Sequence, residues 1–247
     1  MSTVLVLGGT SEALTLAKEL AGDPTTEVVY SLAGRTRTPS LPDCAVRTGG
    51  FGGVEGLAAF VTENNIAAIL DATHPFAAQM ATHARDAAVR TAIPLVKFLR
   101  PEWNEPADAP WLHAASPAAA ATIIRDRFGR VFLSSGLADI AAFAPLSQIW
   151  FLVRSVDPSE APATLAQHHH VIDRGPFDLA AETALLRDWN IDALVSKNSG
   201  GDATGAKLAA AGALGISVVM IDRPPVPPGL LYDDLATTLG AVRDILR

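Results

Sequence analysis

The sequence has a single cysteine, Cys44, in 247 residues. One cysteine cannot form an intrachain disulfide, and it cannot supply the several thiolates of a cysteine-based zinc site. We expect Cys44 to be an ordinary small side chain, buried or half-buried in the fold. The histidine run at 168–170 does not replace such a site, because His168 and His170 could share a strand face but no third ligand has suitable spacing. The sequence therefore predicts no metal site.

Long apolar runs and an excess of basic charge are also missing. No run approaches the roughly 18 apolar residues of a membrane helix, and the apolar run at 4–7 is too short for a signal peptide and has no basic leader. The formal net charge of -7 argues against a general nucleic-acid-binding protein, which normally carries a basic footprint. The composition, 49% hydrophobic and 18% charged, is typical of a globular chain. We expect a cytoplasmic protein that binds neither nucleic acid nor membrane.

Several motifs of common enzyme classes are absent. The chain has no G-x-x-x-x-G-K-[ST] phosphate loop and no G-x-S-x-G nucleophile elbow. Neither Tyr30 nor Tyr232 is followed four residues later by lysine, so the Tyr-Lys pair of short-chain dehydrogenases is missing. These absences exclude the nucleoside triphosphatases, serine hydrolases and dehydrogenases that depend on those motifs.

What the sequence does have is an alternation of short apolar runs, typical of buried parallel strands, with amphipathic helical segments. The expected strands are 4–7, 27–32, 45–47, 66–70, 95–98, 131–133, 149–153, 193–196 and 218–221. This alternation predicts parallel sheets joined by right-handed crossovers. Residues 101–110 contain three prolines and three acidic residues and predict a linker. We therefore expect an α/β protein with two Rossmann-like, doubly wound parallel-sheet domains, 1–100 and 111–247, with a cleft between them.

The first expected strand is followed by a phosphate-binding pattern. Gly8, Thr10 and Ala13 fall on the three key positions of the dinucleotide fingerprint G-x-G-x-x-G/A. Thr10 and Ser11 are good N-cap residues for the next helix, whose N–H groups would attract an anion. The alternative is an ordinary tight turn between a strand and a helix.

The end of the second expected strand, 27–32, bears on cofactor choice. In an NAD site an acidic residue at this position binds the ribose 2′-hydroxyl, whereas an arginine suits the 2′-phosphate of NADP. Asp23 and Glu27 lie at the wrong end of the strand, and Arg35 and Arg37 follow the right end. The pattern favours NADP, and the alternative is two solvated loop arginines.

Glycine-rich and polar segments follow the next strands. The segment TGGFGG at 48–53 would let the backbone approach a ribose or nicotinamide closely, or it only terminates a strand. Asp71, Thr73 and His74 follow the fourth strand and are candidates to line a nicotinamide pocket. His74 is a candidate proton donor, although a histidine before a proline is often a structural hydrogen-bonding residue.

The second half of the chain repeats this arrangement. Ser134-Ser135-Gly136 follows one expected strand, and Lys197 and Asn198 follow another. Gly200 and Gly201 then open a helix, so the segment predicts a second anion site. The alternative is a polar helix start after a capped strand.

Seven segments of the chain resemble those of the precorrin-6A reductases of cobalamin (corrin ring) biosynthesis. They are GGTSEA at 8–13, AGRT at 33–36, GGFGG at 49–53, DATHPFA at 71–77, RGPF at 174–177, SKNSGG at 196–201 and VVMIDRP at 218–224. DATHPFA and SKNSGG together are much more specific than a dinucleotide fingerprint. The resemblance spans nearly the whole chain.

This resemblance implies an oxidoreductase that converts precorrin-6A to precorrin-6B by hydride transfer from NADPH to a double bond of the macrocycle. The cofactor would contact Gly8, Gly9, Thr10, Ser11, Gly34, Arg35, Thr36, Gly49, Gly50, Phe51 and Thr73. The anionic tetrapyrrole would contact Ser135, Arg154, Lys197, Asn198, Ser199, Gly200 and Arg223, with Arg174 and Lys207 as further cationic candidates. His74 would be the catalytic residue, and no metal would be required.

Two other interpretations remain open at this point. One is another NADP-dependent reductase of a small molecule, and the other is a non-catalytic, NADP-sensing Rossmann protein. A sensor would not need a second basic, glycine-rich ligand site, so the segment 196–201 and Arg223 argue against it. In each case we expect a monomer or a small homo-oligomer.

Overall fold

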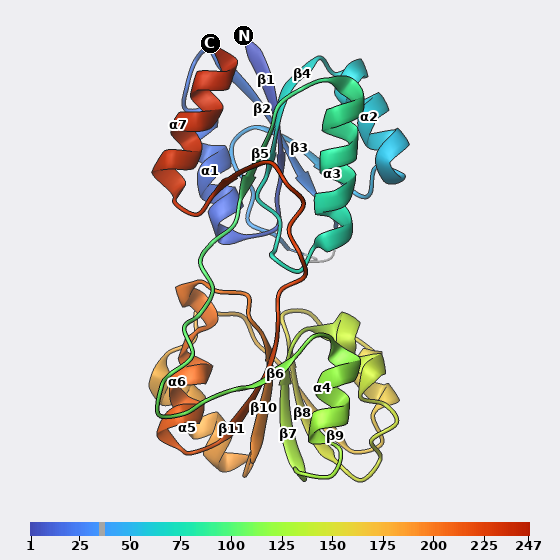
Figure 1. Ribbon diagram of the computed structural model, residues 1–247, viewed down its shortest axis with the longest axis vertical. Coiled ribbons are helices and arrows are strands. Elements are labelled where there is room, and N and C mark those ends of the chain that lie inside the picture. Colours follow the sequence, from blue (N-terminus) through green and yellow to red (C-terminus); the bar gives the residue numbers. More distant parts are fainter. Residues whose placement is uncertain (35–37) are drawn as a thin grey trace. The chain divides into compact units, whose positions relative to one another are not determined.

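The computed structural model describes residues 1–34 and 38–247 (Figure 1). The chain divides into two compact units, of which unit 1 comprises Met1–Pro101 and Pro224–Arg247, and unit 2 comprises Glu102–Arg223. Each unit contains a six-stranded sheet in which every described pairing is parallel, with helices on both faces. The predicted α/β class and the two Rossmann-like sheets are confirmed.

Unit 1 has the strand order β12-β5-β4-β1-β2-β3. Its strands are β1 (Ser2–Leu7), β2 (Thr26–Leu32), β3 (Ala45–Thr48), β4 (Ile66–Asp71), β5 (Leu95–Phe98) and β12 (Leu230–Tyr232). Its helices are α1 (Ser11–Ala21), α2 (Gly53–Glu63), α3 (Ala78–Thr91) and α7 (Leu235–Leu246). The strand order reverses at β1, and such a reversal opens a ligand crevice at the carboxyl ends of the strands.

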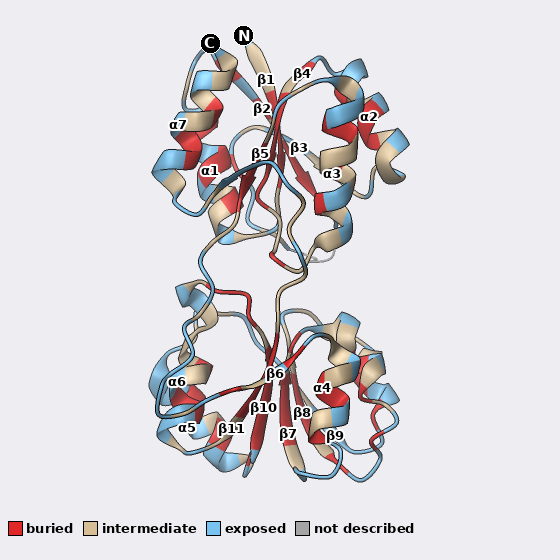
Figure 2. Cartoon of the chain, viewed as in Figure 1, coloured by how far each residue is buried: buried red, intermediate tan, exposed pale blue. Residues whose placement is uncertain are grey.

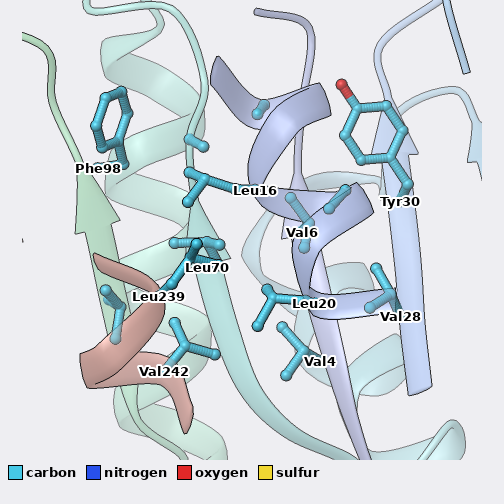
Figure 3. Close-up of a cluster of buried hydrophobic side chains, with 14 of the residues drawn as sticks. Val4, Val6, Leu16, Leu20, Val28, Tyr30, Leu70, Phe98, Leu239 and Val242 are labelled. Atoms are coloured by element: carbon cyan, nitrogen blue, oxygen red, sulfur yellow. The ribbon is translucent and has the colours of Figure 1, made fainter. Parts of the chain in front are cut away.

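The apolar run of β1 is continuous because both faces of its sheet are covered. Val4 and Val6 pack with α1 and α7, where Leu16 and Leu20 lie on the buried stripe of α1 (Figure 3). The residues between and after them, at 5 and 7, pack with α2 and α3 on the other face. Burial of each such side chain stabilises the fold by about 1.5–3 kcal/mol, so strand β1 anchors both layers.

Unit 2 has the strand order β6-β11-β10-β7-β8-β9, which reverses at β7. Its strands are β6 (Leu112–Ala114), β7 (Arg130–Ser134), β8 (Trp150–Ser155), β9 (His168–Ile172), β10 (Ala193–Lys197) and β11 (Ser217–Ile221). Its α-helices are α4 (Pro117–Ile124), α5 (Leu179–Asp188) and α6 (Ala206–Ala213), and its 3₁₀ helices are η1 (Leu137–Ala142), η2 (Ala161–Thr164) and η3 (Asp202–Thr204). Buried residues concentrate in the strands and on the sides of the helices that face them (Figure 2).

The prediction that 111–247 forms one domain is wrong at its end, because 224–247 belongs to unit 1. Strand β12 pairs in parallel with β5, and Leu239 and Val242 of α7 pack into the core beside β4 and β5. Strand β12 and helix α7 follow β5 by more than 130 residues in the sequence, and they contact it only in the folded protein. A boundary drawn from local composition therefore misses their contact.

The predicted linker 101–110 also differs from the structure, because most of it is part of unit 2. The Trp103 N–H donates to Asn198 Oδ1 over 2.9 Å, and the Trp103 indole N–H donates to Gly201 O over 2.9 Å. These bonds hold the segment against the loop after β10. The prolines and acidic residues of segment 101–110 do not predict that contact.

Three strands that the sequence did not predict, β6, β9 and β12, lie at sheet edges. The histidine run at 168–170 begins β9, where His169 stacks on Trp189 and His170 Nε2 lies 2.7 Å from Ser155 Oγ. Edge strands need only one neighbouring strand, so they carry more polar residues than central ones. In the described residues, no helix combines the length and apolar character needed to cross a bilayer.

His113 on β6 joins the segment before that strand to the end of β11. Its Nδ1 lies 2.7 Å from Asp222 Oδ1, and its Nε2 lies 3.3 Å from Glu105 Oε2. The hydrogen bonds to Asp222 and Glu105 raise the pKa of His113 above its usual value. Protonated His113 therefore stabilises this edge of unit 2.

We expect replacement of His113 by glutamine to flatten the pH dependence of stability. A raised pKa in the folded state stabilises the protein fully below the ordinary histidine pKa of about 6.5, and this contribution disappears as the pH rises through the folded value. The wild type should thus lose stability relative to the variant as the pH increases above about 6.5. Urea unfolding across this range measures the difference. A difference that does not change with pH would contradict the assignment.

Candidate functional site

The predicted residues of unit 1 lie at one edge of its sheet, because all its strands are parallel. The segment 8–11 follows β1, Gly34 follows β2, 49–51 follows β3, and Thr73 and His74 follow β4. The first and last of these segments flank the reversal of strand order at β1. Two further predicted cofactor residues, at 35 and 36, lie outside the described residues.

The turn between β1 and α1 is held by Thr10 and Tyr30. Thr10 Oγ1 accepts from Ala13 N–H over 3.0 Å and donates to Ala72 O over 2.9 Å, so it caps α1 and ties the turn to β4. The Gly9 N–H donates to Tyr30 Oη over 3.3 Å. A Cβ at Gly8 would overlap the Tyr30 ring. Gly8 is therefore required by the packing of Tyr30, in addition to the tight turn for which the fingerprint has its first glycine.

Three other glycines at this edge leave open space in front of the backbone, whereas a Cβ at Gly34 would lie 3.0 Å from Thr48 Cγ2. A Cβ added at Gly9, Gly49 or Gly50 would meet no described heavy atom within 4 Å. Gly9 and Gly49 have φ angles of 110° and 112°, which L side chains rarely adopt. The loops after β1 and β3 thus offer a backbone surface on which an extended ligand can lie.

Arg47 at the end of β3 braces the loop that follows. Its guanidinium donates to Gly49 O and Gly50 O, each over 3.0 Å, and to Ser31 Oγ over 2.7 Å. The guanidinium carbon also lies 3.7 Å from the centre of the Phe51 ring. Arg47 therefore fixes the shape of the loop 49–51 by binding its carbonyl groups, and it joins this loop to β2.

A buried ion pair supports the loop after β4. Asp71 Oδ2 lies 2.8 Å from Lys97 Nζ on β5, and the two side chains are 1% and 10% exposed. Asp71 Oδ1 accepts from the Thr73 N–H over 3.0 Å and from the Thr73 hydroxyl over 2.6 Å. The pair thus positions the first residues of the segment that carries His74.

His74 is half-buried beside this loop. Its Nδ1 accepts from the Phe76 N–H over 3.2 Å. Because a nitrogen that accepts a hydrogen bond carries no proton, the geometry assigns the proton of the neutral ring to Nε2. Nε2–H is therefore the hydrogen-bond donor of the neutral His74 ring.

A small pocket opens at the same edge of unit 1. Its lining residues are Thr10, Glu12, Ala72, Thr73, Pro75, Phe98, Leu99 and Arg100. Glu12 Oε1 lies 2.9 Å from Arg100 Nη1 in a largely buried ion pair. Burial raises the pKa of Glu12, but hydrogen bonds and the charge of Arg100 outweigh it, so the pKa lies below its usual value. The acidic charge beside the start of α1 is therefore balanced by an arginine.

In unit 2 the predicted residues lie on both sides of the reversal at β7. Ser135 follows β7, and the segment 198–200 follows β10. Lys197 at the end of β10 lies 2.9 Å from Asp139 in η1, which joins the two loops. Gly200 has a φ of 67° and allows the tight turn after β10.

The loop after β10 is fixed by Asn198 and Arg223. Asn198 Nδ2 donates to Glu102 Oε2 over 2.7 Å, in addition to the bond that its Oδ1 accepts from Trp103. Arg223 donates from Nε to Asn198 O over 2.7 Å and from Nη2 to Ser199 O over 3.2 Å. The Arg223 side chain is 8% exposed. Its observed role is to shape the loop from within.

Arg154 has a protein partner in place of the anionic ligand that the sequence suggested. Its Nη1 bonds to Glu182 Oε1 over 2.5 Å and its Nη2 to Glu182 Oε2 over 3.0 Å, with side-chain exposures of 8% and 2%. The guanidinium also lies 3.6 Å from the Phe177 ring centre. Lys207, likewise expected to meet an anion, is buried and donates to Thr204 O over 2.9 Å. Both cations are thus used inside unit 2.

Sequence reasoning missed Tyr30, Arg47, Lys97 and Arg100. A signal existed for Lys97, because it is a lone charge in the apolar strand LVKF. An isolated charge in a buried strand normally needs a partner, and Asp71 at the end of IAAILD was the matching candidate. Tyr30 and Arg100 join segments far apart in the sequence, and no local signal pointed to their contacts. Most contacts of Arg47 are with the loop that directly follows it, but no motif indicated that its guanidinium would bind the carbonyls of that loop.

Known proteins resemble this chain over nearly its whole length. The model of the family precorrin-6x reductase CbiJ/CobK matches residues 3–245. A precorrin-6A reductase of Rhodococcus erythropolis is 50% identical over 248 residues, which cover 100% of both chains. A solved structure of CobK precorrin-6A reductase is 41% identical with a TM-score of 0.92, and the match covers 99% of this chain and 98% of that one. A cobalt-precorrin-6A reductase of Priestia megaterium is 28% identical over 252 residues, covering 97% of each chain.

Replacement of Arg47 by methionine should destabilise unit 1, because it removes three hydrogen bonds and the stacking on Phe51 while keeping an apolar stem. We expect the free energy of unfolding to fall by about 1–3 kcal/mol, measured by urea denaturation. Arg90→Met is the matched control, since Arg90 is 50% exposed and pairs with exposed Glu55. Its effect should stay below about 0.5 kcal/mol. Equal losses in both variants would show that Arg47 does not brace the loop.

Proposed function

The chain belongs to the precorrin-6x reductase family CbiJ/CobK, and we propose that it reduces precorrin-6A to precorrin-6B with a hydride from NADPH. The family and the named relatives make the chain a reductase of cobalamin biosynthesis. A reductase of this kind uses a nicotinamide cofactor, and the non-catalytic sensor is set aside.

The open backbone edge of unit 1 is the observation that carries this proposal. The space in front of Gly9, Gly49 and Gly50 suits a dinucleotide that crosses the carboxyl ends of the strands. The capped start of α1 adds N–H groups that lack intrahelical partners and suit a pyrophosphate. These features support a dinucleotide site at this edge of unit 1.

Each loop of unit 1 has its own task in this proposal. The first turn of α1 binds the pyrophosphate, and the loop 49–51, braced by Arg47, lies on the adenosine side of the reversal. Thr73 and His74 lie on the nicotinamide side, where the Nε2–H of the neutral His74 ring is a candidate hydrogen-bond donor to the macrocycle, and water supplies the proton that completes the reduction. When bound, NADPH supplies the hydride that saturates one double bond.

Unit 2 binds the carboxylate-rich macrocycle in this proposal. The backbone of 198–200 and the Ser135 hydroxyl provide neutral donors, and Lys197, which pairs with Asp139 but is 19% exposed, provides a partly balanced positive charge at the end of β10. Arg223 acts through the loop that it shapes, and Arg154 is left out because Glu182 holds it. We assign the cobalt-free substrate, since the precorrin-6A relative is 50% identical and the cobalt-precorrin relative only 28%.

The reaction is tested by following deuterium from NADPH. The enzyme is given precorrin-6A and NADPH that carries deuterium on one face or the other of nicotinamide C4. One of the two labelled forms should deliver deuterium to a ring carbon, and NADPH should be consumed in equal molar amount. Visible absorption should shift, because saturation of a double bond shortens the conjugated system. Oxidation of NADPH with no label in the macrocycle from either form would overturn the proposal.

Cofactor choice is tested at Arg35, whose guanidinium we assign to the 2′-phosphate. Arg35→Ala should weaken NADPH binding by about 10- to 150-fold, the loss expected for one charge-assisted contact, and should leave NADH binding nearly unchanged. Calorimetric titration of both cofactors measures this, with Arg90→Ala as the control for loss of a surface arginine. Equal affinity of the wild type for NADH and NADPH would refute the NADPH assignment.

A further inference from the structure

The ion pair of Asp71 and Lys97 is expensive to bury and has no role yet in the reaction. A charge removed from water loses several kcal/mol of solvation, and apolar residues often replace such pairs without loss of stability. The pair lies at the carboxyl ends of β4 and β5, where Asp71 and Lys97 are directly paired residues of the sheet. Because the pair lies at the sheet edge where we propose that the cofactor binds, we look for its role in cofactor binding.

The pair determines the hydrogen-bonding character of Thr73. Lys97 occupies Asp71 Oδ2, and Thr73 occupies Oδ1 through both its N–H and its hydroxyl. A threonine hydroxyl has one hydrogen and two lone pairs. Since that hydrogen is donated to Asp71 over 2.6 Å, the oxygen can only accept from any other group. Among the described residues, the Thr73 hydroxyl has no other hydrogen-bond partner.

Thr73 also lines the pocket beside the start of α1. It follows β4, on the side of the strand reversal opposite to β2 and β3, which is the nicotinamide side of a doubly wound sheet. A nicotinamide carboxamide has an NH₂ donor at one end and a carbonyl acceptor at the other. A hydroxyl that can only accept will bind the NH₂ end and reject the carbonyl end.

We propose that Asp71 and Lys97 are positioning residues that hold the Thr73 hydroxyl as an acceptor for the NH₂ of the nicotinamide carboxamide. This inference rests on the proposed function, because it requires the nicotinamide to lie at unit 1. It assigns the residue that selects the orientation of the carboxamide, and with it the orientation of the ring that carries the hydride.

The test compares binding of NADP⁺ with that of its 3-acetylpyridine analogue, in which a methyl group replaces the NH₂. Calorimetry of the whole protein should give the wild type about a tenfold preference for NADP⁺, the scale of one buried hydrogen bond. Thr73→Val removes the acceptor at nearly constant volume and should reduce the preference to below about twofold. Thr73→Ser keeps the hydroxyl and should retain it.

Two outcomes separate this inference from the proposed function. If Thr73→Val binds NADP⁺ and keeps the wild-type preference for it over the 3-acetylpyridine analogue, Thr73 does not select the carboxamide. The proposed function is unaffected by that result. Failure of the wild type to bind NADP⁺ at all overturns the proposed function and the inference with it.

The positioning residues are tested by removing both charges together. Asp71→Leu combined with Lys97→Met leaves no lone buried charge, so the protein should still unfold cooperatively. Because its Thr73 hydroxyl is free to rotate and donate, the preference for NADP⁺ should fall to below about twofold. The matched control is the buried pair of unit 2, Arg154→Leu with Glu182→Leu, which should keep the wild-type preference. A folded Asp71/Lys97 double variant with an unchanged preference would overturn the positioning role.

Discussion

The parallel pairing of β1 with both β2 and β4 is the constraint on which unit 1 depends. Parallel strands bring all their carboxyl ends to one edge, and the reversal of order at β1 turns the following helices to opposite faces. Segments from 8 to 74 therefore meet at one edge although they are far apart in the chain. Unit 2 has the same reversal of strand order at β7, where Ser135 and the loop after β10 lie on either side of it. The same topology thus provides an edge for each of the two proposed ligands.

Charged side chains near both edges mostly support loops from within. Arg47 binds carbonyls of the loop after β3, Lys97 holds Asp71, and Arg223 binds carbonyls of the loop after β10. Buried charges must be paired or hydrogen-bonded because the protein interior solvates them poorly. The candidate cofactor surface of unit 1 is accordingly made mainly of backbone and hydroxyl groups. Such surfaces suit a dinucleotide whose phosphates are bound by N–H groups.

The candidate site shows where residue type alone misleads. Arg154 was expected to bind a substrate carboxylate because of its charge and its place near a strand end. In the structure it binds the carboxylate of Glu182 on α5. Gly8 fitted the fingerprint, yet its missing side chain also accommodates Tyr30. In both cases the deciding neighbour comes from a segment more than twenty residues away. A motif gives the chemistry that a position can perform, and the neighbours decide which chemistry it does perform.

The sequence by itself determined the α/β class, the alternation of strands and helices and the strand ends where the candidate residues lie. These features depend on local apolar periodicity, on glycine and on capping residues, all of which act within a few positions. Only the tertiary structure decided that 224–247 completes unit 1, that 102–110 belongs to unit 2 and that Lys97 meets Asp71. Strand order and charge pairing join residues distant in sequence, and their energy depends on a burial that no local pattern contains.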